Sequence, residues 1–365
     1  MTRSITTSSR RRFLQVLGGL GVLAVPAGAA PALGLTIERY AATLPGGYGA
    51  RAVLKAGATW QGGRIVLVGR ALEARDRAAL EAAFSRLGPV DNRMEIFPFK
   101  AMGERAWGAV RASGTDLRAE PDAGSELVSQ ALPGDTLKVL ARSGDGRWYQ
   151  ILREWDGYVG WIPAERAVLW TEAEWQAWQS APRSMLMRSL PGLPRGSIVA
   201  GVGGRRGRTA EGQEVTIPSE ALRRIEPGEV PTAARVVELA RVLLADQPTR
   251  YLWGGTLDRA LDCSGFNQTV YRMAGGAIPR DSYQQQAASR PVAPRAEDWR
   301  QLAPGDLLFF SEKRSRATHT GIYVGDGRFI HASSHNQGIA ENHLMGEGEY
   351  ERFLRRIYFG AGRVV

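Results

Sequence analysis

The amino-acid sequence predicts an α+β protein built from several small domains, and three observations lead to this prediction. The 365 residues are too many for one ordinary hydrophobic core, and a composition of 44% hydrophobic and 23% charged residues is typical of a globular protein. Short strands separated by turn residues fill the middle of the chain. Helical patterns followed by a series of strands fill its last third, as expected when helices pack on one face of an antiparallel sheet.

The first 30 residues predict an export signal. The basic segment "SRRRFLQ" precedes a short apolar run, 16–30, that ends in small residues. The paired Arg10 and Arg11 resemble a twin-arginine signal, which exports folded proteins across a bacterial inner membrane. An uncleaved membrane anchor is the alternative, but the run is short for a membrane span. We expect cleavage at its end and a protein of the periplasm or cell envelope without stable membrane insertion.

The chain carries a formal net charge of +10. A basic exported protein could bind nucleic acid, anionic lipid or an acidic polymer. Outside the predicted signal, the dense basic cluster "GRRGR" at 204–208 is equally consistent with a solvated hairpin tip. We therefore expect no nucleic-acid partner, and at most a general attraction to an anionic wall polymer.

A small α/β lobe is predicted at 36–100. Segments that alternate like strands flank "EARDRAALEAAFSRLG", in which Ala79, Leu80, Ala83, Phe84 and Leu87 form one helical stripe. The lobe loosely resembles the BON-like modules of bacterial envelope proteins. Nothing in it indicates catalysis.

Two small β-barrels are predicted next. The region 105–169 has short strands and four turn motifs, at Glu120-Pro121-Asp122, Pro133-Gly134-Asp135, Gly144-Asp145-Gly146 and Asp156-Gly157. The pattern "LRAEP…SELVSQALPGD…LKVL…DGRWYQI…DGYVGWIP" resembles a bacterial SH3-like domain. The region 180–229 looks like a shorter, degenerate second copy, and "WTEAEWQAW" (170–178) is predicted to be a connecting helix or turn.

The last domain, 230–365, is predicted to begin with a helix that starts near Pro231 and Thr232 and ends before Pro248. A second helical run follows "DCSGF". The later segments predicted as strands are "GDLLFF" (305–310), "HTGIYVG" (319–325), "RFIHA" (328–332) and "FLRRIYF" (353–359).

The last domain also holds the residues that could carry chemistry. The only cysteine, Cys263, lies here with all four histidines, His319, His331, His335 and His343. A thiol nucleophile needs a base, and the base needs a third group to orient its ring. His319 begins one predicted strand and His331 ends the next, so the tight turn at 325–327 would bring their rings together. Cys263 is expected at a helix N-terminus, where backbone N–H groups lower a thiol pKa and can hold an oxyanion.

Each of these residues also has a purely structural interpretation. A lone buried cysteine is often a small core residue, and Asp262 could be only the N-cap of its helix. His331 and His335, spaced as HxxxH, could bind zinc, but that spacing aligns two ligands on a helix, and this segment is predicted as a strand and a loop. The presence of every histidine in the same domain as the only thiol favours catalysis, with neither metal nor cofactor.

The motifs "YLWGG", "DCSGF", "PRDSYQQ", "PGDLLFF" and "HTGIYVGDGRFIHA" resemble, in order, those of the NlpC-type cell-wall cysteine peptidases, which have a papain-like fold. The resemblance covers about 250–360. It implies that Cys263 is the nucleophile, His319 the general base and His331 the third, polar member of a triad.

SH3-like domains ahead of such a peptidase are similar to the arrangement in the γ-D-glutamyl-L-diamino acid endopeptidases that recycle cell-wall peptides. By this resemblance, Tyr251 lies at the active site, and Asp262, Ser264 and Ser282 help to hold the L-Ala-γ-D-Glu part of the substrate. The first SH3-like domain contributes Glu126 and Tyr158 to the substrate's free amine. The N-terminal lobe and the twin-arginine signal depart from this pattern.

The resemblance thus implies a hydrolase that acts on peptidoglycan-derived peptides with a free N-terminal L-Ala. One alternative is an endopeptidase on intact stem peptides, in which the SH3-like domains only tether the enzyme. An amidase or acyltransferase on the same thiol fold, and a wall-binding module with an idle triad, are the others. The sequence does not distinguish diaminopimelate from lysine in the substrate.

Overall fold

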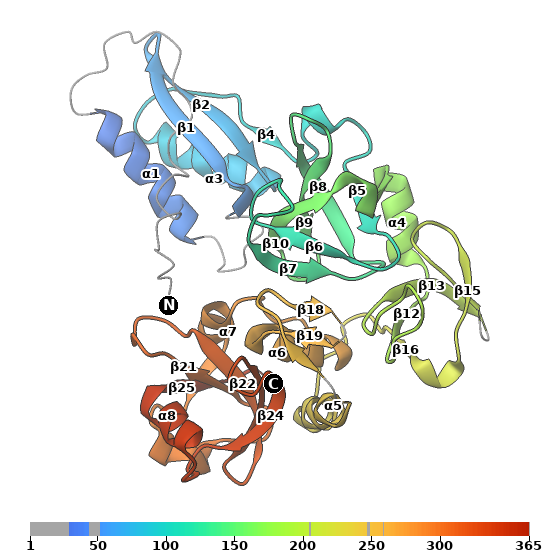
Figure 1. The fold of residues 1–365 in the computed structure, drawn as a ribbon. Coiled ribbons are helices and arrows are strands. Elements are labelled where there is room, and N and C mark those ends of the chain that lie inside the picture. The colour runs from blue at the N-terminus through green and yellow to red at the C-terminus, as the bar shows by residue number, and fades with distance from the viewer. Residues whose placement is uncertain (1–28, 44–51, 204–205, 247–248, 258, 365) are drawn as a thin grey trace.

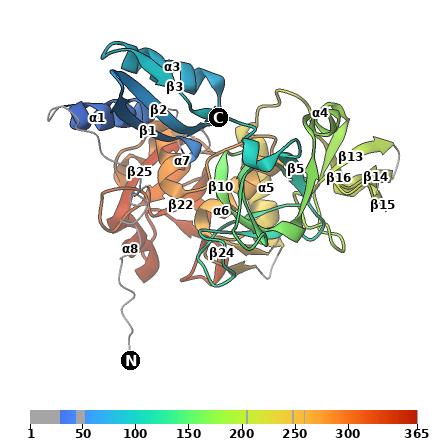
Figure 2. The same ribbon diagram turned by 90° about the horizontal axis from the view of Figure 1, so that it is seen from above.

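The computed structural model describes residues 29–43, 52–203, 206–246, 249–257 and 259–364, which form four consecutive units (Figure 1). The N-terminal lobe and the second barrel lie at opposite ends, with the first barrel between them (Figure 2). The predicted export signal, apart from its last two residues, lies outside the described residues and stays a prediction. Within the described ranges, no helix is both long and apolar enough to cross a membrane.

The N-terminal lobe is a four-stranded sheet with two helices on one face. Its elements are α1 (Ala29–Thr43), β1 (Lys55–Gln61), β2 (Arg64–Ala71), α3 (Ala74–Ser85), β3 (Val90–Asn92) and β4 (Glu95–Ile96). β1 and β2 form an antiparallel hairpin, and α3 is the crossover that places β3 parallel to β2. Leu80 and Phe84, one turn apart on α3, are fully buried in a core with Ile65 and Leu67 of β2.

The first barrel is a seven-stranded antiparallel sheet that surrounds one core. In sheet order its strands are β11 (Ala167–Trp170), β5 (Trp107–Val110), β8 (Thr136–Arg142), β9 (Trp148–Arg153), β10 (Tyr158–Pro163), β6 (Thr115–Arg118) and β7 (Leu127–Ala131). The side chains of Leu117, Leu137, Val139, Ile151 and Ile162 are fully buried in that core. Strand alternation directs these apolar residues inward.

A helix, α4 (Glu172–Ser180), connects the two barrels. Its N-cap residue, Thr171, forms a capping box with Glu174, which explains why this segment is helical rather than a turn. The second unit is a five-stranded sheet in the order β15 (Glu214–Thr216), β14 (Arg206–Arg208), β13 (Ile198–Gly203), β12 (Arg183–Leu186) and β16 (Leu222–Arg224).

The C-terminal domain places helices on both faces of an antiparallel sheet. The sheet order is β20 (Arg290–Val292), β25 (Tyr358–Arg363), β21 (Leu307–Phe310), β22 (His319–Gly325), β23 (Arg328–Ser333) and β24 (Gly338–His343). The other elements are α5 (Ala233–Ala245), α6 (Cys263–Met273), α7 (Ser282–Ala288), α8 (Glu349–Ile357) and a small sheet of β17 (Arg250–Tyr251), β19 (Ala260–Leu261) and β18 (Thr256–Leu257). Leu307 and Phe309 face the core with α5 and α6, whereas Leu308 and Phe310 face the core with α8.

The predicted strand at 353–359 is wrong for most of its length, because residues 349–357 form α8 and only the last two residues belong to β25. Apolar residues at 350, 353, 354 and 357 follow the helical period, and Leu354 is buried. Acidic residues in the first turn and basic residues in the last turn also match the helix dipole. The prediction of helices on one face only is corrected for the same reason, since α8 covers the second face.

The first barrel and the C-terminal domain are joined through buried polar contacts. The Gln130 side-chain oxygen accepts hydrogen bonds from the backbone N–H groups of Thr256 (3.0 Å) and Leu257 (3.1 Å). Arg272 of α6 forms a buried ion pair of 2.5 Å with Asp135 in the barrel. Gly254, with φ of +77°, passes so close to β7 that a Cβ there would lie 2.4 Å from the Leu127 carbonyl oxygen.

We expect Arg272→Ala to destabilise the protein by roughly 3–5 kcal/mol, because Asp135 would remain buried without its cation. Urea unfolding followed by tryptophan fluorescence measures the loss. Arg235→Ala, which removes an exposed ion pair with Glu238, is the control and should cost less than about 1 kcal/mol. Equal losses in the two variants would contradict a joining role for the buried pair.

Candidate active site

Cys263 is the first residue of α6, and the preceding Asp262 is the N-cap of this helix. The Asp262 carboxylate accepts a hydrogen bond of 2.7 Å from the backbone N–H of Gly265, which fixes the first turn. The Cys263 side chain is buried, at 6% exposure. The backbone N–H groups of Thr320 and Ser264 act to lower the pKa of its thiol. The nucleophile candidate therefore lies between the start of α6 and the residue that follows His319 on β22.

The two predicted triad histidines lie side by side on β22 and β23. The distance from His319 Nε2 to His331 Nδ1 is 2.6 Å, and His331 is fully buried. Gly321 creates the space for this pair, because a Cβ on it would lie 2.9 Å from the Cβ of His331. His319 begins β22 and His331 lies near the end of β23. Because the two strands are antiparallel, the hairpin register brings the two rings together.

A side-chain amide orients the histidine pair from behind. Asn342 Oδ1 lies 3.0 Å from His331 Nε2, and an amide oxygen can only accept a hydrogen bond. We therefore assign the proton of neutral His331 to Nε2, which leaves Nδ1 to accept the N–H of His319 Nε2. The lone pair of His319 is then on its other ring nitrogen, where it is available to a proton donor outside the pair.

Burial determines the charge state of the catalytic candidates. It raises the pKa of the Cys263 thiol to about 12, with the nearby Asp262 carboxylate as the next cause. It lowers the pKa of His319 well below its usual value, and His331 lowers it further. Burial lowers the pKa of His331 to about 4. In the free protein at neutral pH the thiol and both imidazoles are therefore uncharged.

A pocket of about 190 Å³ collects most of the other predicted residues around Cys263. From the C-terminal domain its lining includes Tyr251, Asp262, Ser264 and Ser282, and from the first barrel it includes Glu126 and Tyr158. Glu126 and the exposed Trp253 meet across the two domains, because Trp253 Nε1 donates to Glu126 Oε1 at 3.1 Å. The structure thus brings Glu126 and Tyr158 to the thiol from more than 100 positions earlier in the chain.

The Asp262 carboxylate has its hydrogen-bonding capacity occupied in the free protein. Arg280, which is 2% exposed, donates to both Asp262 oxygens, at 3.0 and 2.7 Å. Gly254 donates its backbone N–H to Asp262 Oδ2 at 2.9 Å. Arg280 also donates to the Ser264 hydroxyl and, in the barrel, to that of Ser129. Asp262 thus anchors the nucleophile's helix to the "PRDSYQQ" turn and to the first barrel.

A second, larger groove of about 1210 Å³ lies at His319. It shares Tyr251 and Thr318 with the thiol pocket and is lined by His319, by α8 and by the 333–335 turn. His335, the second residue of the HxxxH pattern, lies at this groove and stacks on Tyr350 at 3.8 Å between ring centroids. His331 instead bonds to Asn342, and the described residues contain no cluster of His, Cys, Asp or Glu able to hold a metal ion.

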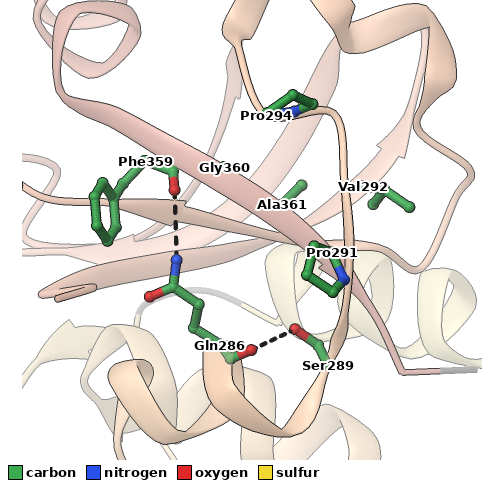
Figure 3. A pocket seen from close by; sticks show the side chains of 8 residues that line it. All are labelled: Gln286, Ser289, Pro291, Val292, Pro294, Phe359, Gly360 and Ala361. Atoms are coloured by element: carbon green, nitrogen blue, oxygen red, sulfur yellow. Dashed lines mark hydrogen bonds between the residues drawn. The ribbon is translucent and has the colours of Figure 1, made fainter.

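Another pocket lies between α7 and β25 (Figure 3). Its volume is about 290 Å³, and its lining residues include no ionisable side chain. A hydrogen bond from Gln286 to the carbonyl of Phe359 crosses it. It therefore contains neither a nucleophile nor a base, unlike the pocket at Cys263.

Several residues of the site had no role in the sequence-based prediction. Arg280 lies inside the "PRDSYQQ" motif, but its partner Asp262 is 18 residues earlier in the chain, so the motif alone did not indicate this ion pair. Asn342, Trp253 and Thr320 gave no signal either, because their contacts depend on strand register and on the packing of the barrel.

Comparison with known proteins agrees with this geometry. The family model described as "NlpC/P60 family" matches residues 248–357. The model described as "Bacterial dipeptidyl-peptidase Sh3 domain" matches residues 117–166. Residues 248–357 are an NlpC/P60 domain. The resemblance noted from the motifs is confirmed, as is the α+β fold with an SH3 domain ahead of the NlpC/P60 domain.

Curated relatives match parts of this chain. A γ-D-glutamyl-L-lysine dipeptidyl-peptidase of Bacillus cereus is 26% identical over 63% of this chain and 74% of its own length. The enzyme of the same name from Bacillus subtilis is 36% identical over 28% of this chain and 34% of its own length. A probable endopeptidase p60 of Listeria innocua is 37% identical over 31% of this chain, which spans only 22% of that protein.

Solved structures show the same fold. A crystal structure of an NlpC/P60 family protein from Bacillus cereus aligns with a TM-score of 0.59 over 70% of this chain and 99% of that protein, at 20% identity. An NlpC/P60 endopeptidase from Photobacterium damselae aligns with a TM-score of 0.53 at 17% identity, over 72% of each chain.

The lowered pKa of His331 makes the NlpC/P60 domain acid-sensitive. Unfolded protein takes up a proton near pH 6.5 and folded protein only near pH 4, so stability falls as pH drops between these values. We expect His331 to contribute about 3 kcal/mol of this loss, and His331→Gln to remove that part. Urea midpoints at pH 7 and pH 4.5 measure it. His343→Gln, outside the pair, should keep the wild-type acid sensitivity; an unchanged sensitivity in His331→Gln would refute the assignment.

Proposed function

We propose that this protein is a cysteine peptidase that hydrolyses the γ-D-glutamyl–diamino acid amide of cell-wall peptides with a free N-terminal L-Ala. The observation that carries the proposal is the closure of the Cys263 pocket by Glu126 and Tyr158 of the SH3 domain. A carboxylate from a second domain, placed in the pocket of the nucleophile, suits a substrate with an ammonium group. The names of the two Bacillus relatives support the same bond.

In this mechanism the thiol proton of Cys263 passes to His319 as the sulfur attacks the γ-glutamyl carbonyl. The uncharged resting state fits this order, because burial disfavours a standing thiolate–imidazolium pair. His331 holds the His319 tautomer through the 2.6 Å contact, and Asn342 holds His331 in turn. Backbone N–H groups at the start of α6, and the hydroxyl of Tyr251, would stabilise the oxyanion.

Protonated His319 then donates to the leaving amine, and water releases the acyl group from Cys263. His319 lines the larger groove, whereas Cys263 and Glu126 line the smaller pocket. We therefore assign the L-Ala-γ-D-Glu part to the smaller pocket and the departing diamino acid, with anything attached to it, to the larger groove.

The ammonium of L-Ala would pair mainly with Glu126. Asp262, Ser264 and Ser282 remain proposed as walls of this subsite. However, the oxygens of Asp262 already accept from Arg280, Gly254 and Gly265 in the free protein. We therefore expect Asp262, Ser264 and Ser282 to shape the subsite. Glu126 supplies the negative charge that remains available to the substrate.

Digests of L-Ala-γ-D-Glu-diaminopimelate, free and N-acetylated, test the proposal by mass spectrometry. We expect cleavage of the free peptide only, and none by Cys263→Ala. Glu126→Gln should lower kcat/KM for the free peptide roughly tenfold by weakening one charge-assisted contact. Glu120→Gln, a surface change in the same loop outside the pocket, is the matched control.

A second candidate, an endopeptidase on intact stem peptides, is favoured by the size of the groove on the leaving-group side. Equal cleavage of free and acetylated peptides would select it and discard the role of Glu126. Retained activity in Cys263→Ala would discard the thiol mechanism, and a lack of activity in the wild type would leave a wall-binding module.

The lowered pKa of His319 predicts the acid side of the pH–rate profile. The base must be uncharged to accept the thiol proton, and burial keeps it uncharged below pH 6.5. We expect kcat/KM of wild-type protein to remain level from pH 8 to pH 6.5 and to fall only at lower pH. An acid limb centred at or above pH 6.5, on a substrate that does not itself titrate there, would contradict this role of His319.

Export remains part of the proposal. The relatives include a probable endopeptidase p60 of Listeria innocua, and residues 1–30 carry the predicted twin-arginine signal. A periplasmic or envelope location would place the enzyme beside peptides released from peptidoglycan, where it would serve cell-wall recycling.

A further inference from the structure

The smaller pocket, at Cys263, is lined by two arginines, Arg280 and Arg316. The guanidinium of Arg280 is already neutralised by a carboxylate. Arg280 donates from Nη1 and Nη2 to the two Asp262 oxygens and from Nε to the Ser129 hydroxyl. Its side chain is almost fully buried. A substrate carboxylate would have to break this ion pair to reach the charge of Arg280, which is costly for buried partners.

The two serines of the pocket also use their protons within the protein. The Ser264 hydroxyl lies 3.3 Å from Asp262 Oδ1 and accepts from Arg280, and the Ser282 hydroxyl donates to the carbonyl of Ala317 at 3.0 Å. A hydroxyl has one proton to donate. Neither serine can therefore offer a hydrogen bond to a carboxylate without giving up a contact that holds the pocket together.

Arg316 is the second guanidinium, and its situation is different. It lines the same pocket as Cys263 and lies three residues before His319. Its guanidinium carbon lies 5.0 Å from the centre of the Tyr283 ring, over the ring face. Within the described ranges, no carboxylate lies within 4.0 Å of its nitrogens.

Stacking on Tyr283 restricts the rotation of the Arg316 side chain and leaves the N–H groups at the guanidinium edge able to donate. A planar, bidentate donor of this kind is well suited to a carboxylate. The pocket thus presents an unneutralised carboxylate, Glu126, and a cation with no carboxylate partner, Arg316. The acyl group L-Ala-γ-D-Glu has the complementary charges, an ammonium and an α-carboxylate.

We propose that Arg316 binds the α-carboxylate of the γ-glutamyl residue and makes the enzyme selective for γ-glutamyl over γ-isoglutaminyl substrates, in which that carboxylate is an amide. This inference rests on the proposed function for the identity of the acyl group. It gives Arg316 a part in holding L-Ala-γ-D-Glu, for which the family resemblance had indicated Asp262, Ser264 and Ser282.

The test compares two substrates, L-Ala-γ-D-Glu-L-Lys and L-Ala-γ-D-isoglutaminyl-L-Lys, with wild-type protein and Arg316→Gln. We expect wild type to prefer the acid in kcat/KM by roughly 10- to 100-fold, the range of a charge-assisted contact, and Arg316→Gln to lose most of this preference. Arg316→Lys should keep part of it. A wild type without preference, or a variant that slows both substrates equally, overturns the proposal.

Arg314→Gln is the matched control. Arg314 lies on the same exposed loop, but it donates to the carbonyl of Tyr358 and stacks on Phe359, away from the pocket lining. The acid-to-amide preference should be unchanged in this variant. Loss of the preference in Arg314→Gln as well would show an effect of overall loop charge and overturn the assignment to Arg316.

A binding measurement separates this inference from the proposed function. Calorimetry with Cys263→Ala and the dipeptides L-Ala-γ-D-Glu and L-Ala-γ-D-isoglutamine requires no catalysis. If no peptide is cleaved but the acid binds more tightly and Arg316→Gln removes the difference, the proposed reaction fails and the carboxylate site stands. If acid and amide bind alike, the carboxylate site fails whatever the enzyme cleaves.

Discussion

The buried ion pair between Arg280 and Asp262 is the contact on which the rest of the site depends. Through it the N-cap of the nucleophile's helix, the turn before α7 and the SH3 domain share one set of hydrogen bonds. Removal of either partner would leave an uncompensated charge, a loss of several kcal/mol in a buried setting. The position of Cys263 is therefore set by an interdomain contact as much as by its own helix, and the SH3 domain is a structural part of the active site.

The arrangement of Cys263, His319 and His331 could be predicted from the sequence because these residues lie in short, local patterns. A helix start fixes Cys263, and a tight hairpin fixes His319 relative to His331. Asn342 and Arg316 could not be found in this way, since strand pairing and loop packing bring them to the site. The strand expected at 353–359 was wrong because a run of apolar residues was interpreted without its helical period, although Leu354 and its neighbours show that period clearly.

The two cavities next to the catalytic candidates would divide the proposed substrate into an acyl half held by charged groups and a leaving half held more loosely. The smaller one has charged groups from both domains and is partly closed by the contact between Trp253 and Glu126. The larger one is lined by α8 and is several times as large. Such an asymmetry favours selection by the acyl group and tolerance of varied leaving groups.

The protonated resting state of Cys263 has a consequence for the lifetime of the enzyme. Peroxides oxidise thiolates far more readily than thiols, and a sulfenic acid is normally rescued by a second cysteine that forms a disulfide with it. This chain has no second cysteine. A thiol that is enclosed and deprotonated only during attack is exposed to oxidants for a small part of the catalytic cycle. The burial that keeps this thiol protonated thereby protects a group for which the chain holds no second cysteine.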